Sequence, residues 1–110
     1  MQFIYPTRIS DTRTWPGVPL EAGREYDFTI DPSIVPAGAA GFVANVTAIS
    51  AGAAGFVTVW GAGPRPNTSC ANFDASGAIA SAVATGLSGG GFRVYVSAPC
   101  HLLLDATAWA

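Results

Sequence analysis

The sequence contains no lysine and one histidine, and only 11% of its 110 residues are charged, against about 25% in an average soluble domain. Its five basic residues are arginines dispersed along the chain, and seven acidic residues bring the formal net charge to −2. A phosphate backbone attracts a basic patch or stripe, and the sequence offers none. We therefore expect no nucleic-acid partner.

Long apolar runs are absent as well, although half of the residues are hydrophobic. Glycine, proline or a polar residue interrupts every run before the roughly 18 to 20 residues that a membrane-spanning helix needs, so we expect no membrane insertion. The first twenty residues lack the basic start and continuous apolar segment of a signal peptide. If residue 1 is the native start, the protein is made in the cytoplasm without this kind of export signal.

Clustered catalytic or metal-binding residues are missing too. No Cys-x-x-Cys, His-x-His or calcium-loop spacing occurs. The single histidine, His101, precedes Asp105 by four residues, which on a strand separates the two by about 13 Å and prevents direct contact. The sequence thus predicts a non-enzymatic protein with no catalytic residue, no metal and no cofactor.

What the sequence does contain is alternation of apolar and polar residues with a period of two, the pattern of half-buried strands. A turn at 50–55 is expected to join two strands in a hairpin, and 78–87 has a short helix as its alternative. The spacing predicts a single domain over residues 1–110, an all-β, jelly-roll-like antiparallel β-sandwich of seven or eight strands. The expected strands are 3–5, 26–30, 42–49 (a central strand), 56–60, 70–73 (a short edge strand), 78–87, 92–96 and 101–109.

Two cysteines, Cys70 and Cys100, allow two interpretations. A disulfide would close a loop of about 30 residues, contribute roughly 3 kcal/mol in the chain-entropy model, and indicate an oxidising environment at some stage. The alternative is a pair of free buried thiols.

Three tryptophans, Trp15, Trp60 and Trp109, also allow two interpretations. Together with the tyrosines they could form a platform on which sugar rings stack. Aromatic residues more often belong to the core or to a protein interface, and we favour that reading.

Several short motifs follow one another in a fixed order. They are RISDTR at 8–13, PLEAG at 19–23, NVT at 45–47, PRP at 64–66 and HLLLD at 101–105. In this order they resemble a small all-β module that is repeated or appended in secreted surface proteins of actinobacteria such as streptomycetes and mycobacteria. The resemblance implies a wall-associated or adhesive module and transfers no catalytic residue. Cys70 and the end of the chain, 106–109, depart from the pattern.

The resemblance also implies a structural network around the Asp-Thr-Arg motif at 11–13 and Asp105. We hypothesise a buried ion pair between Arg13 and Asp105 within it.

A surface module without an export signal needs another route out of the cell, and assembly into a phage particle provides one. We therefore predict a virion structural protein of an actinobacterial phage, either a capsid decoration or a tail-surface protein. Its partners would be other virion proteins such as the major capsid protein, and its low charge would reflect apolar contact surfaces and favour a homo-oligomer. The alternative is a secreted or wall-associated module that binds host cell-wall polysaccharide.

Overall fold

The computed structural model describes residues 1–67 and 71–110, and these ranges contain strands and turns but no helix. The predicted all-β architecture is confirmed, including a strand rather than a helix at 78–86. The eight strands are β1 (Gln2–Asp11), β2 (Arg24–Thr29), β3 (Gly41–Ser50), β4 (Gly55–Trp60), β5 (Ala71–Phe73), β6 (Ala78–Gly86), β7 (Gly91–Val96) and β8 (Cys100–Trp109).

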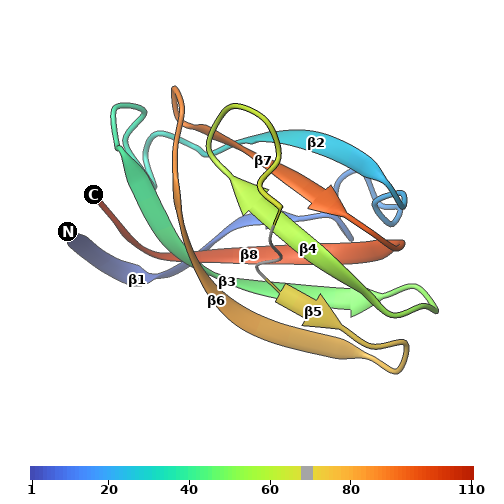
Figure 1. The fold of residues 1–110 in the computed structure, drawn as a ribbon. Coiled ribbons are helices and arrows are strands. Elements are labelled where there is room, and N and C mark those ends of the chain that lie inside the picture. Colours follow the sequence, from blue (N-terminus) through green and yellow to red (C-terminus); the bar gives the residue numbers. More distant parts are fainter. Residues whose placement is uncertain (68–70) are drawn as a thin grey trace.

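The strands form two four-stranded antiparallel sheets, which Figure 1 shows as the two layers of a sandwich. Sheet A has the order β1-β8-β3-β6, and sheet B has the order β2-β7-β4-β5. The chain therefore pairs its first strand with its last, its second with its seventh, and so on inward to β4 and β5. The chain is thus a long antiparallel ribbon folded over into the two layers of the sandwich, which is the jelly-roll arrangement that the sequence predicts.

β1 is longer than the expected strand at 3–5. Pro6 lies within it, and its pairing with β8 shifts register between Phe3 and Thr7 and again between Arg8 and Ser10. Bulges of this kind let an edge strand accommodate a proline, and they also interrupt the alternation of apolar and polar residues. The sequence pattern therefore shows only part of the strand.

The predicted hairpin across 50–55 is wrong. β3 and β4 belong to different sheets, so the connection crosses from one layer of the sandwich to the other. Ser50 fixes this turn, because its hydroxyl accepts hydrogen bonds from the backbone N–H groups of Gly52 and Ala53, at 3.0 and 3.1 Å. A flexible, small-residue turn fits both a hairpin and a crossing, and only the partners of the strands distinguish them.

The core lies between the two sheets and is built from the inward-facing residues of the central strands. Phe92 of β7 joins the layers, with ring centroids 5.5 Å from Phe28 in its own sheet and 5.1 Å from Phe42 in sheet A. Burial of each large aliphatic side chain contributes roughly 1.5 to 3 kcal/mol. The fully buried residues of the central strands include Ala44, Val46, Ala48, Val57, Val94, Val96, Leu102, Leu104 and Ala106.

The outer face of sheet B is covered by the loop that follows β4. Trp60 points outward from β4 yet is only 4% exposed, because the loop folds over it and its indole N–H donates to the carbonyl of Gly63 at 2.9 Å. Further along, the guanidinium of Arg65 lies 3.7 Å from the ring centroid of Tyr95 on β7, a cation–π contact. The Pro-Arg-Pro segment is thus a cover for this sheet.

Replacing Trp60 tests this cover. We expect Trp60→Ala to lower the free energy of unfolding by about 3 to 5 kcal/mol, as for other buried aromatic residues. Trp60→Phe keeps most of the packing and should cost less, chiefly the hydrogen bond to Gly63, worth about 1 kcal/mol. Urea denaturation measures both, and an alanine variant as stable as the parent would show that the loop does not bury the indole.

Candidate functional site

A polar network lies where β1 meets β8 and continues into the turn after β1. Arg8 donates from Nε and Nη2 to the two carboxylate oxygens of Asp105, at 2.9 and 3.1 Å. Arg13 donates in the same two-pronged way to Asp11, at 3.0 and 2.9 Å. The network therefore exists, but the predicted Arg13–Asp105 pair is wrong. The register between β1 and β8 places Arg8 directly opposite Asp105. Arg13 lies beyond the end of β1, and its side chain is half exposed.

Thr12 is the buried centre of this region and is fully inaccessible to solvent. Its backbone N–H donates to the carbonyl of Leu102 at 3.0 Å, and its hydroxyl oxygen accepts from the N–H of Leu102 at 2.9 Å. The same oxygen lies 3.0 Å from Nδ1 of His101, and the tautomer of the ring decides which of the two donates. Thr12 thus extends the β1–β8 pairing by one residue and holds the histidine at the end of the sheet.

Substitution of Thr12 tests this role. Thr12→Val keeps the shape but leaves the N–H of Leu102 buried without a side-chain acceptor, so we expect a loss of about 1 to 3 kcal/mol in the free energy of unfolding. Thr12→Ser keeps the hydroxyl and should cost less. If the two variants prove equally stable in chemical denaturation, the hydroxyl does not carry the interaction.

The pH dependence of stability tests the Asp11 pair. Hydrogen bonding from Arg13 lowers the pKa of Asp11 from its ordinary 3.8 to about 2, because it favours the ionised carboxylate in the folded state. The folded state therefore gains stability above pH 4, and this gain is lost as the pH falls toward 2. Thermal unfolding across this window should show a steeper acid loss for the parent than for Asp11→Asn. Parallel curves would contradict the pairing.

A groove runs along the seam of the sandwich, between the edge strand β1 of sheet A and the edge strand β2 of sheet B. Its volume is about 470 Å³. Trp15, 81% exposed, lies at this groove on the turn after β1. The other lining residues are Ile9, Ser10, Asp11, Thr14, Asp27, Phe28 and Thr29.

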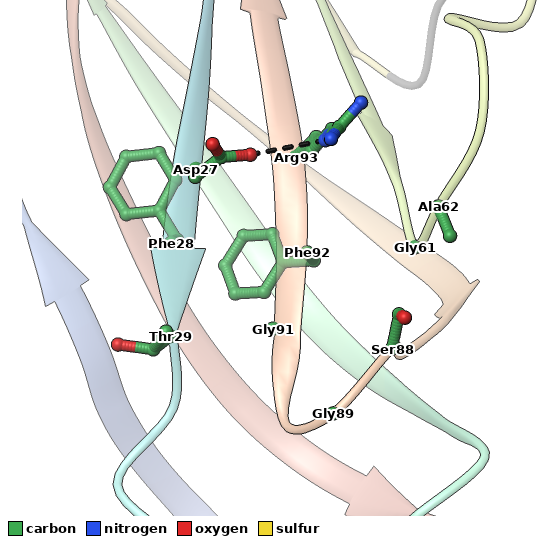
Figure 2. A pocket seen from close by; sticks show the side chains of 10 residues that line it. All are labelled: Asp27, Phe28, Thr29, Gly61, Ala62, Ser88, Gly89, Gly91, Phe92 and Arg93. Carbon is green, nitrogen blue, oxygen red and sulfur yellow. Dashed lines mark hydrogen bonds and ion pairs between the residues drawn. The ribbon is translucent and has the colours of Figure 1, made fainter.

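A second hollow, of about 290 Å³, lies on the other side of β2 and shares residues 27–29 with the groove. Figure 2 shows Asp27 and Arg93 on neighbouring strands above it, joined by an ion pair of 3.1 Å, with the rings of Phe28 and Phe92 beside them. The rest of its wall is formed by Gly61, Ala62, Ser88, Gly89 and Gly91. Asp27, whose side chain is 82% exposed, thus stands between the two hollows.

The three tryptophans do not form one platform. Trp15 is exposed at the seam, Trp60 is buried under the loop of sheet B, and Trp109 is half-buried at the end of β8. Trp109 borders an apolar hollow of about 420 Å³ beside both chain ends, which Figure 1 shows next to each other. Met1, Phe42 and residues 84–86 of β6 line the same hollow. The three rings therefore lie in separate parts of the molecule, and only those of Trp15 and Trp109 reach its surface.

The outer face of sheet A shows a feature that sequence reasoning missed. Along β6 every second residue is an exposed alanine, while the residues between them turn toward the core. Neighbouring positions on β3, Asn45 and Thr47, are uncharged. The alternation in AIASAVATG could have identified this outward row of alanines. These alanines are Ala78, Ala80, Ala82 and Ala84.

Cys100 is a fully buried free thiol, and burial raises its pKa to about 11. Cys70, its partner in the predicted disulfide, lies outside the described residues. Within 1–67 and 71–110, no group of three or more His, Cys, Asp or Glu side chains could hold a metal ion. Those ranges also contain no helix long and apolar enough to cross a membrane.

No protein-family model, curated protein or solved structure matches this chain. The resemblance to the actinobacterial surface module stays a prediction.

Proposed function

We propose that the chain is a non-enzymatic structural module that docks on a larger protein assembly through β6, with a phage virion as the assembly that fits best. The neighbouring subunit would be another virion protein, such as the major capsid protein, or a second copy of this chain. Jelly-roll domains are common in viral capsids and in lectins, which supports the setting by analogy of fold alone.

The observation that carries the proposal is the difference between β6 and the other three edge strands. β1 contains Pro6 and two register shifts, β2 carries Arg24, Glu25 and Asp27, and β5 is three residues long. These are the usual devices by which proteins prevent edge-to-edge association. β6 has none of them: its nine residues contain no charge and no proline, and it pairs with β3 in one unbroken register.

An open edge of this kind presents unpaired backbone N–H and C=O groups. Within the described residues, β6 has a strand neighbour on one side only. A strand from a neighbouring subunit could extend sheet A there, with main-chain hydrogen bonds giving affinity and the small alanines allowing close approach. The end of β6 leads into the apolar hollow of Trp109, which offers a place for an anchoring side chain.

Binding of cell-wall carbohydrate, the alternative function, would need a different surface. The outer side of β6 consists of alanines and offers no aromatic ring for stacking. The exposed Trp15 lies at the seam between β1 and β2, so a virion protein could dock through one edge of the sandwich and present the other to the host.

Co-sedimentation with particles tests docking. Purified chain mixed with intact phage particles that lack it should bind saturably, at a fixed number of copies per particle. Ala82→Lys places a charge in the middle of β6 and should weaken this binding at least about tenfold, because a lysine on an edge strand opposes its pairing with another strand. Binding is measured by quantifying chain in the particle fraction of a density gradient.

Ala53→Lys provides the matched control, since Ala53 is an exposed alanine in the turn between β3 and β4. This variant should bind like the parent, and both variants should unfold at similar temperatures. Failure of the parent to sediment with particles, or equal binding by both variants, would refute the proposed dock.

A further inference from the structure

We propose that the seam groove between β1 and β2 binds a neutral sugar ring, which stacks on the indole of Trp15. The inference goes beyond docking through β6 and uses a separate surface, because β1 and β6 are the opposite edges of sheet A.

Trp15 combines high exposure with a fixed backbone. The N–H groups of Thr14 and Trp15 both donate to the carbonyl of Asp11, at 3.1 and 3.2 Å, and Gly17 donates to the carbonyl of Thr12 at 2.9 Å. The hydroxyl of Thr14 adds a further bond to Asp11, at 2.9 Å. Because the backbone of this turn is already held by hydrogen bonds, binding of a ligand to the indole orders little additional main chain, so stacking energy goes into affinity.

The groove offers the second half of what a sugar requires. A pyranose has an apolar C–H face and a rim of hydroxyl groups. Ile9 and Phe28, which pack against the core, supply apolar lining, while the carboxylates of Asp11 and Asp27 supply hydrogen-bond acceptors on either side. Hydroxyl groups of Ser10, Thr14 and Thr29 complete the polar lining. A mixed lining of this kind, in a volume of about 470 Å³, is typical of small-ligand sites.

The charges favour a neutral ligand. Two carboxylates line the groove and no arginine does. Asp11 is held in place by the two-pronged pairing with Arg13, and the more exposed Asp27 forms an ion pair with Arg93. An anionic sugar such as a uronate would find these arginines already paired and no other cation in the groove lining, whereas hydroxyl groups of a neutral hexose or N-acetylhexosamine can donate to the remaining lone pairs of both carboxylates.

Isothermal titration calorimetry with defined tetrasaccharides tests the site. The probes are cellotetraose and chitotetraose as neutral ligands, and tetragalacturonate as the anionic comparison. We expect saturable binding of at least one neutral probe and weaker binding of the uronate. Trp15→Ala should weaken the neutral probe at least about tenfold, and Trp15→Phe should retain part of the affinity.

Tyr5→Ala is the matched control, because Tyr5 is 91% exposed on β1, the strand that precedes the turn of Trp15, but does not line the groove. It should leave the affinity unchanged, and so should Ala82→Lys, which separates this proposal from docking. Absence of saturable binding by both neutral probes up to roughly 10 mM would overturn the proposal. Full affinity for the sugar in a folded Trp15→Ala variant would overturn it too. The proposal would also be overturned if the parent bound no sugar and Trp15→Ala lost particle docking, because the indole would then serve docking.

Discussion

The pairing of β8 with strands on both of its sides is the constraint on which the rest of the structure depends. β8 lies between β1 and β3, so it fixes the register of sheet A, while its inner residues, Leu102, Leu104 and Ala106, are fully buried. Because β1 and β8 come from opposite ends of the sequence, sheet A closes only when the whole chain is present, as expected for a fold rich in long-range contacts. The Arg8–Asp105 pair and the Thr12–Leu102 bonds both follow from this register. They in turn hold the turn that presents Trp15.

The outer faces of the two sheets differ in how far the chain covers them. Sheet B is covered by its own chain, with Trp60 buried beneath the loop and Arg65 stacked on Tyr95. In the part of the chain that the structure describes, no such cover lies over the row of exposed alanines on β6 of sheet A. Because the chain has so few charges, only local features such as Pro6, the bulges of β1 and the charges of β2 oppose edge-to-edge association of its sheets. Their absence from β6 distinguishes this edge and supports its assignment to an interface.

Much of the fold could be predicted from alternation of apolar and polar residues, because that pattern is local. The strands around Tyr26, Val46 and Val94 are correct to within one or two residues, and the jelly-roll arrangement follows from their number and spacing. Non-local relations could not be predicted in this way. Asp105 pairs with Arg8 because the two residues are opposite each other in the β1–β8 register, a relation that no motif or sequence distance reveals. The turn at 50–55 crosses between sheets because β3 and β4 pair with other strands and not with each other. The seam groove lies between two edge strands that do not pair, so no sequence pattern marks it.

Hydrogen–deuterium exchange, compared between the free chain and the chain bound to an assembly, tests the central claim most directly. In the free chain, amides of 78–86 that point away from β3 should exchange quickly, since an unpaired edge leaves them open to water. In the bound chain the same amides should become protected, while those at the seam, 9–15, should stay unchanged. Protection elsewhere with no change along β6 would contradict docking through this edge.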